Sequence, residues 1–87
     1  MVMVDKIQKT IKIAEWKRSQ AERIRVTLEL FRGRNVVVLR TWWKDKDGKD
    51  QPGRDGITLD VAQVTKLARV FKRARKQAKK AGLIDEL

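Results

Sequence analysis

Aromatic rings and guanidinium groups are interleaved along residues 31–54, and they carry the chemistry that this sequence offers most clearly. The aromatic members are Phe31, Trp42 and Trp43, and the basic members are Arg32, Arg34, Arg40 and Arg54. Aromatic rings stack on nucleobases, and guanidinium groups neutralise phosphates. This combination predicts a surface that binds a nucleic acid.

Groups suited to catalysis or metal binding are scarce. The sequence has no His, Cys or Tyr, which removes the commonest general base, thiolate metal sites and disulfides. Residues 45–50 are similar to a calcium loop, but Lys49, Asp50 and Gly56 stand where the template needs an oxygen ligand, a glycine and a glutamate. We therefore expect a hairpin turn there, no metal site, no cofactor and no enzymatic activity.

The charge of the chain indicates a polyanionic partner. Its 87 residues carry 22 Lys and Arg against 11 Asp and Glu, a net charge of +11. Such an excess is typical of proteins that bind nucleic acid. One small domain buries little surface, so dimerisation is an expected source of stability. The longest aliphatic run, residues 36–39, is too short to span a membrane. We expect no membrane partner and a cytoplasmic or nucleoid location.

Residues 23–32 have the alternation of a half-buried strand. Apolar residues occupy every second position, and Phe31 falls on the polar side of the alternation. Gly33 permits a tight reversal, and Pro52 restricts its segment to an edge or an irregular start of a strand. The expected strands are residues 10–17, 23–32, 35–44 and 56–59.

A helix is expected over residues 60–81. Asp60 can cap its first turn together with Gln63, and Gly82 can end it. The apolar residues Val64, Leu67, Ala68, Phe71, Ala74 and Ala78 keep helical spacing. Eight cations and no acid lie between Val61 and Gly82. The cations are Lys66, Arg69, Lys72, Arg73, Arg75, Lys76, Lys79 and Lys80.

These elements predict an α+β fold, a four-stranded antiparallel sheet followed by one C-terminal helix. Residues 1–9 are expected to form a mobile basic arm. Residues 10–87 are expected to form a single domain, with the sheet in 10–59, the helix in 60–81 and a tail in 82–87.

Two motifs at preserved spacing resemble the DNA-binding core of the positive-cofactor-4 family of transcriptional coactivators and their bacterial and phage relatives. They are Phe31-Arg32-Gly33-Arg34 with Leu39-Arg40 and Trp43, and the run from Pro52 to Leu59. The resemblance implies a homodimer paired through its helices, whose curved four-stranded sheets cradle single-stranded or unwound DNA. Residues 10–87 would then form one single-stranded DNA-binding domain, in a bacterial, archaeal or viral host cell. The residues that the resemblance assigns to DNA binding are Phe31, Arg32, Arg34, Arg40, Trp43 and Arg54. Arg23 and Arg25 on the preceding strand complete the expected site.

The sequence departs from the family pattern at Gln51 and Asp55, where basic residues are expected. Both departures remove positive charge from the loop around Arg54, and the basic helix is a candidate to supply DNA binding in its place. Trp42, next to Trp43, is expected to be mostly structural.

The leading hypothesis is a sequence-tolerant single-stranded DNA-binding protein that acts on unwound DNA in replication, recombination or transcription. Replication or transcription proteins are then further expected partners. One alternative is a small basic architectural protein that binds duplex DNA or RNA through its C-terminal helix. Another is an interaction module that docks on an acidic protein surface.

Overall fold

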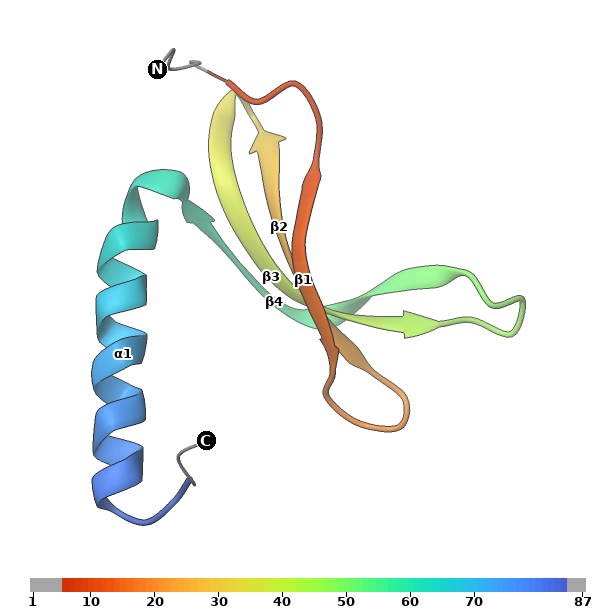
Figure 1. Ribbon diagram of the computed structural model, residues 1–87. Helices are drawn as coiled ribbons and strands as arrows, with labels where there is room; N and C mark the ends of the chain where they lie inside the picture. The colour runs from red at the N-terminus through yellow and green to blue at the C-terminus, as the bar shows by residue number, and fades with distance from the viewer. Residues whose placement is uncertain (1–5, 85–87) are drawn as a thin grey trace.

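The computed structural model describes residues 6–84, which form one twisted antiparallel sheet followed by one helix (Figure 1). The strands β1 (Ile11–Lys17), β2 (Arg23–Phe31), β3 (Arg34–Lys44) and β4 (Asp50–Asp60) pair in chain order. A 3-10 turn, η1 (Val61–Gln63), leads into the helix α1 (Val64–Lys80). The predicted α+β fold and the first three strands are confirmed.

The strand register gives the sheet two chemically different faces. Arg25 of β2 lies opposite Arg40 of β3, and their neighbours Val26 and Leu39 pair on the other side. Successive side chains point to opposite faces, so each pair fixes the face of its neighbours. The polar face carries Arg23, Arg25, Thr27, Glu29 and Phe31 of β2, and Arg34, Val36, Val38, Arg40 and Trp42 of β3. The apolar face carries Ile24, Val26, Leu28 and Leu30 of β2, Val37, Leu39 and Thr41 of β3, and Ile57 and Leu59 of β4.

The last strand is longer than the sequence indicated. A short strand at residues 56–59 was expected, but β4 pairs with β3 from Asp50 to Asp60. Pro52 is tolerated because β4 is an edge strand, which pairs with β3 alone. The missing amide donor of a proline then disrupts no hydrogen bonding to a further strand. A bulge opposite Thr41 absorbs the extra residues of β4. The prediction of strand 56–59 alone was therefore wrong in length, and the edge position of Pro52 is confirmed.

The helix begins later than expected. The Asp60 carboxylate accepts a hydrogen bond from the amide of Ala62 at 2.9 Å, and the side chain of Gln63 makes no capping bond. Residues Val61–Gln63 form a 3-10 turn instead, so the α-helix starts at Val64. The expected cap by Asp60 is confirmed, at the start of the 3-10 turn, whereas the expected contribution of Gln63 to a capping box is wrong.

The end of the helix follows the prediction. Gly82 has φ +72°, a left-handed conformation that glycine adopts readily. The amide of Leu83 donates to the carbonyl of Ala78 at 2.8 Å, and the amide of Gly82 donates to that of Lys79 at 3.0 Å. These two bonds are those of a Schellman motif, which ends the helix at Lys80. Within residues 6–84, no helix has the length and apolar character needed to cross a bilayer.

The two ends of the chain are described only in part. Residues 1–5 of the expected arm and residues 85–87 of the expected tail lie outside the described residues. The backbone amide of Ile7 donates to the side-chain oxygen of Asn35 at 2.9 Å. The last residues of the expected arm are therefore attached to the start of β3.

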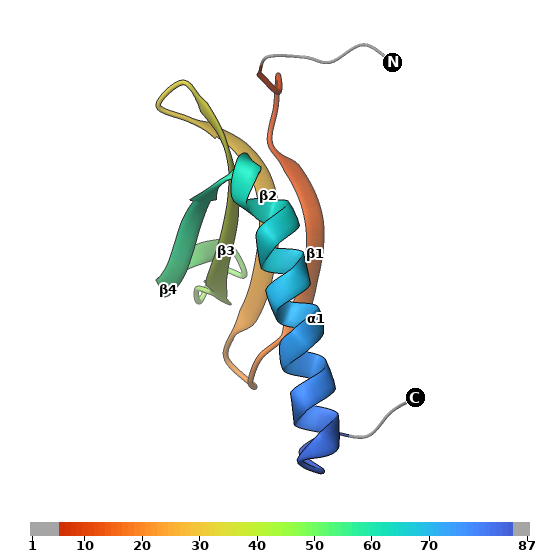
Figure 2. The same ribbon diagram turned by 90° about the vertical axis from the view of Figure 1, so that its left-hand side faces the viewer.

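Very little apolar surface is buried within one chain. Helix α1 stands beside the sheet and is joined to β4 through η1 (Figure 1 and Figure 2), and none of its residues is buried. Val36, 5% exposed, is the buried hydrophobic residue among those described. An apolar cavity of about 300 Å³ separates α1 from the apolar face of the sheet. Its lining consists of Ile57, Leu59, Gln63, Lys66, Leu67 and Val70.

Candidate nucleic-acid interface

Phe31 lies at one end of the polar face, in the hairpin that joins β2 to β3. Arg32 and Gly33 both have positive φ, +51° and +77°, which reverses the chain in two residues. This conformation places the Arg32 guanidinium carbon 5.1 Å from the centre of the Phe31 ring. Phe31 is 51% exposed. The hairpin thus presents an exposed aromatic side chain with a cation over one face of its ring.

Arg34, which pairs with Phe31 across the hairpin, is attached to the end of β4. Its Nε donates to Oδ2 of Asp60 at 2.8 Å, and a second nitrogen donates to the same oxygen. The hydrogen bond from the amide of Ala62, followed by that from Arg34, lowers the pKa of Asp60 below its ordinary value. Arg34 remains largely exposed, so a phosphate could reach it but would compete with Asp60.

Arg23 and Arg25 form an ion-pair network with acids of both edge strands. Arg25 donates to Glu15 of β1 at 2.6 Å and to Asp50 of β4 at 2.7 Å. Arg23 donates to Asp50 at 2.6 Å, and its Nε lies 3.4 Å from Glu15. The side chains of Arg25 and Arg23 are only 16% and 22% exposed. They therefore link the sheet across its width instead of standing free for a ligand.

The electrostatics of this network favour the charged forms of its acids. Hydrogen bonds from Lys44, Arg25 and Arg23 hold the pKa of Asp50 far below its ordinary value. The hydrogen bond from Arg25 likewise lowers the pKa of Glu15. Both acids are ionised at neutral pH and cancel much of the positive charge of the arginines.

Trp42 supports the same network from the polar face. The guanidinium carbon of Arg25 lies 4.2 Å from the centre of its ring, a distance at which cation and ring attract each other. The ring is half-buried and covered by that cation. This position agrees with a mainly structural role for Trp42.

Arg40 is the arginine in the middle of the polar face, and its surroundings differ from those of Arg23 and Arg25. It donates to the backbone carbonyl of Gly53 at 3.2 Å. Its guanidinium lies against Gly56, where an added Cβ would be 2.8 Å from its central carbon. Among residues 6–84, no carboxylate forms an ion pair with Arg40. Its charge is therefore positioned by backbone and left uncompensated, which suits binding to a phosphate.

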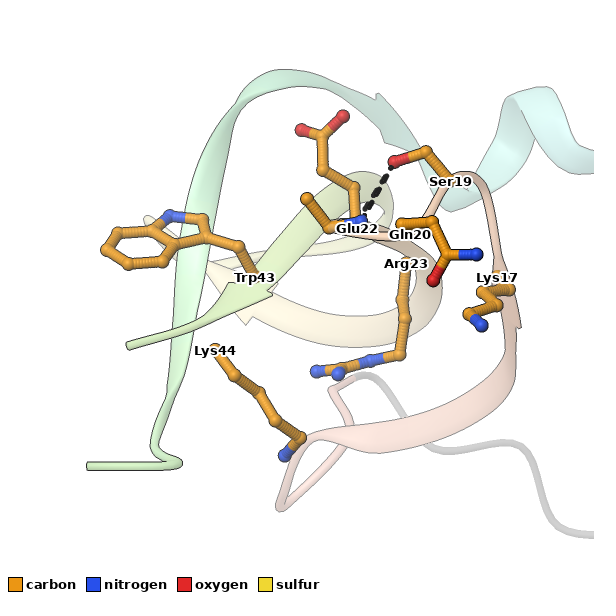
Figure 3. Close-up of a pocket in the computed structure, with 8 residues that line it drawn as sticks. Lys17, Ser19, Gln20, Glu22, Arg23, Trp43 and Lys44 are labelled. Atoms are coloured by element: carbon orange, nitrogen blue, oxygen red, sulfur yellow. Dashed lines mark hydrogen bonds between the residues drawn. The ribbon is translucent and has the colours of Figure 1, made fainter. Parts of the chain in front are cut away.

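Trp43 does not share a face with Phe31 and Arg40. The β2–β3 register places it one residue beyond Trp42, and its side chain extends away from those of Arg23 and Lys44 (Figure 3). Trp43 is 43% exposed and borders a pocket of about 330 Å³ between the β1–β2 turn and the end of β3. The structure therefore separates the two aromatic residues that the sequence grouped together.

The pocket beside Trp43 adds residues that the sequence did not single out. Its lining consists of Lys17, Ser19, Gln20, Ala21, Glu22, Arg23, Trp43 and Lys44. The Ser19 hydroxyl accepts a hydrogen bond from the amide of Glu22 at 3.2 Å, which shapes the turn (Figure 3). An indole wall with lysines nearby can hold a stacked base and its phosphate. The position of Lys44 directly after the tryptophan pair is a sequence signal for it, whereas nothing in the sequence connects Lys17 with Trp43.

The loop that departs from the family pattern uses its two altered residues for internal contacts. Asp55 pairs with Arg18 at 3.0 Å, and the Gln51 side chain donates to Asp45 at 3.0 Å. Arg54 between them is exposed and has no ion-pair partner within residues 6–84. Three of the eight predicted site residues are thus cations without a carboxylate partner within residues 6–84: Arg32, Arg40 and Arg54.

Comparison with known proteins identifies the group to which this arrangement belongs. The family described as Transcriptional Coactivator p15 (PC4) matches residues 18–70, more than half of the chain. The chain belongs to the PC4 family. The match includes β2, β3 and β4 and ends within α1, so it covers both motifs that suggested the resemblance.

Solved structures of PC4 homologues have the same fold. A PC4 homologue from Burkholderia pseudomallei K96243 is 28% identical, with a TM-score of 0.67 over 79% of this chain and 93% of that chain. A second crystal form of that homologue gives a TM-score of 0.66 over 77% and 98% of the two chains at the same identity. A bacteriophage T5 homologue of the eukaryotic coactivator PC4, implicated in recombination-dependent DNA replication, shares the fold at 20% identity. Its TM-score is 0.59 over 85% of this chain and 83% of that chain.

Proposed function

We propose that this PC4-family protein is a homodimer that binds single-stranded DNA on the polar face of its sheet. The observation that carries the proposal is the row of exposed Phe31, Arg32 and uncompensated Arg40 on one face. Phe31 and Arg23 lie at opposite ends of β2, about 27 Å apart at the rise of an antiparallel strand. A polar face of that length accommodates several nucleotides.

Open bases distinguish a single strand from a duplex at this face. A ring such as Phe31 can stack only on a base whose own face is free, and bases in a duplex are already stacked on each other. The arginines neutralise phosphates of either form, so the preference depends on the aromatic residues. Trp43 with its lysine-lined pocket extends the same chemistry around the end of β3.

The relatives support a role on unwound DNA. The family is described as a transcriptional coactivator, and the phage T5 homologue is implicated in recombination-dependent DNA replication. Transcription, replication and recombination all expose single strands. We propose that this chain protects or organises such strands, with replication or transcription proteins as further partners.

A matched pair of aromatic substitutions tests the DNA-binding face. Phe31 and Trp16 are about equally exposed, at 51% and 48%, but Trp16 pairs with Ile24 and so belongs to the apolar face. Phe31→Ala should weaken binding to poly-dT by about 1–3 kcal/mol, whereas Trp16→Ala should leave it nearly unchanged. Fluorescence anisotropy of labelled poly-dT measures both. Equal losses, or none for Phe31→Ala, would contradict the proposal.

The homodimer is proposed from the apolar surface that one chain leaves uncovered. Phe71 is 58% exposed, Val70 48% and Ile57 52%. Val70 and Ile57 line the cavity between α1 and β4, and Phe71 follows Val70 on the helix. Burying one such side chain contributes about 1.5–3 kcal/mol. A second copy of the chain offers the same apolar helix face and is therefore a fitting partner.

Sedimentation equilibrium at micromolar concentration and moderate salt tests this assembly. The wild-type protein should have twice the mass of one chain, and Phe71→Glu should shift it toward the monomer by placing a charge in the interface. Lys72→Glu, which adds the same side chain next to Phe71 on the basic side, is the matched control and should remain dimeric. A monomeric wild type would contradict the dimer without bearing on the DNA-binding face.

A further inference from the structure

The outward side of α1 is a continuous band of positive charge. At about 100° per residue, Arg69, Lys72, Arg73, Lys76 and Lys80 fall on one side of the helix, and we term them the basic helix face. The sequence has no acid from Val61 to Gly82. None of the five forms an ion pair with any residue in the described range 6–84. Ordinary solvated faces mix both signs, so a face of one sign needs a separate explanation.

The basic helix face is directed away from both the sheet and the proposed dimer interface. Leu67 and Val70 line the cavity shared with β4. Lys76 lies roughly half a turn around the helix from Leu67. Arg69, Lys72, Arg73 and Lys76 instead border a hollow of about 380 Å³ of their own. A second copy that covers the apolar side of α1 therefore leaves this hollow open.

The side chains of the basic helix face suit the phosphate backbone of a duplex better than a single strand. Its five side chains are cations, and no aromatic ring lies among them, so the face can neutralise phosphates but cannot stack on open bases. From Arg69 to Lys80 the helix rises about 17 Å. Duplex DNA presents one charge per about 1.7 Å of its axis, roughly ten charges over that length. A single strand offers fewer charges over the same length, and its bases find no partner here.

We propose that the basic helix face is a second DNA-binding surface, which takes the phosphate backbone of duplex DNA while the sheet remains free for a single strand. Four of its five residues lie beyond residue 70, where the family match ends. The family match therefore leaves most of this surface uncovered. A protein with both surfaces can hold a duplex and an unwound strand together. Duplex binding by the helix does not depend on what the sheet binds, whereas the joint binding of a duplex and a single strand rests on the proposed function.

Two triple variants with the same net charge test the surface. Arg69→Gln, Lys72→Gln and Lys76→Gln together remove three cations from the basic helix face. Lys9→Gln, Lys46→Gln and Lys49→Gln remove three exposed cations elsewhere. Glutamine has nearly the helix propensity of Lys and Arg, so α1 should persist, and circular dichroism checks it. Binding of a blunt duplex and of poly-dT is measured for each variant over a range of salt concentrations.

The helix variant should lower the duplex salt slope by roughly 2–3, which is about 0.9 for each phosphate that is no longer neutralised, and should leave poly-dT binding unchanged. The control variant should leave the duplex slope nearly intact.

Equal effects of the two variants would show that only the net charge of the protein matters, and would overturn the inference. A helix variant that loses poly-dT as strongly as duplex would also overturn it, as would displacement of duplex by phosphatidylserine vesicles at equal phosphate concentration. If the triple variant unfolds, Lys72→Gln and Lys76→Gln are measured singly, each with an expected decrease of about 0.9 in slope.

Simultaneous binding provides a second readout. Wild-type protein held on immobilised poly-dT in excess should capture a labelled blunt duplex, and the helix triple variant should not. Absence of capture by the wild type would contradict the two-surface arrangement. If poly-dT does not retain the protein, the proposed single-strand function is refuted. If the helix variant still loses duplex binding in that case, the duplex-binding surface on the helix is supported.

Discussion

The guanidinium group of Arg40 lies directly over Gly56, so close that a methyl group on Gly56 would meet its central carbon at 2.8 Å. The two residues are partners across the β3–β4 ladder. The missing side chain at residue 56 is what lets the arginine lie along the surface of β4, with a hydrogen bond to the carbonyl of Gly53. This relationship positions Arg40, the cation in the centre of the polar face. Arg40 has no acid partner among the described residues.

Gly56→Ala should consequently weaken DNA binding without much loss of stability. The obstructed group is the far end of a flexible side chain, so Arg40 can move aside at low cost and lose its position. Gly53→Ala is the matched control, because its Cβ would meet Thr41, including the Thr41 backbone oxygen at 3.0 Å. We expect Gly53→Ala to lower the free energy of unfolding, measured with urea, and Gly56→Ala to lower mainly the affinity for poly-dT. The opposite pattern would show that Gly56 is structural.

Trp43→Ala should cost about 1–3 kcal/mol in binding to poly-dT and should change duplex binding little. The indole is exposed beside a pocket with lysines on its wall, and only an open base can stack on it. Trp42→Ala serves as the contrast. It removes the ring beneath Arg25 and should lower stability more than affinity. A Trp43→Ala variant that loses both substrates equally, with an altered circular dichroism spectrum, would indicate folding damage instead.

Asp50→Asn should tighten DNA binding. The Asp50 carboxylate accepts hydrogen bonds from Lys44, Arg23 and Arg25. Loss of its charge leaves these cations undercompensated and raises the positive potential at that end of the sheet. We expect higher affinity for poly-dT and a steeper salt slope, by about 0.7 for each additional phosphate that is neutralised. Unchanged affinity would show that DNA does not approach this network.

Stability should fall in acid through the same network. The hydrogen bonds from Lys44, Arg25 and Arg23 lower the folded-state pKa of Asp50, and that from Arg25 lowers the pKa of Glu15. A lowered pKa means that the unfolded chain binds protons more readily, so the stabilisation is complete above the ordinary carboxyl range of about 4 and is lost below it. Urea unfolding at fixed protein concentration should give a constant free energy above about pH 5 and a decline below about pH 4. The decline should be shallower in Asp50→Asn, and an identical decline would contradict this role of Asp50.

The sequence predicted those elements whose hydrophobic period is regular. The alternation of residues 23–32 and the spacing of Val64, Leu67 and Phe71 led directly to β2 and α1. The length of β4 was missed because Pro52, Gly53 and Gly56 interrupt any alternation there. Such residues pair in a strand only when it lies at an edge or contains a bulge, and this depends on the neighbouring β3.

The candidate site was predictable in its residue types but not in its geometry. The resemblance to the family selected Phe31, Arg40 and Trp43 by position along the chain, whereas the strand register decides which face each one occupies. The ion pairs of Arg25 with Glu15 and Asp50 join residues 10 and 25 positions apart. Without the register, Arg23 and Arg25 looked as available to phosphate as Arg40.

An NMR titration of nitrogen-15-labelled protein with a short oligo-dT tests most directly whether the polar face of the sheet binds single-stranded DNA. The three tryptophans give separate indole signals, one from each of Trp16, Trp42 and Trp43. We predict that the backbone signals of Phe31 and Arg40 and the indole signal of Trp43 shift during the titration, while the Trp16 indole and the basic helix face remain unchanged. Shifts confined to α1 and Trp16, with Phe31, Arg40 and Trp43 unaffected, would contradict binding at the sheet.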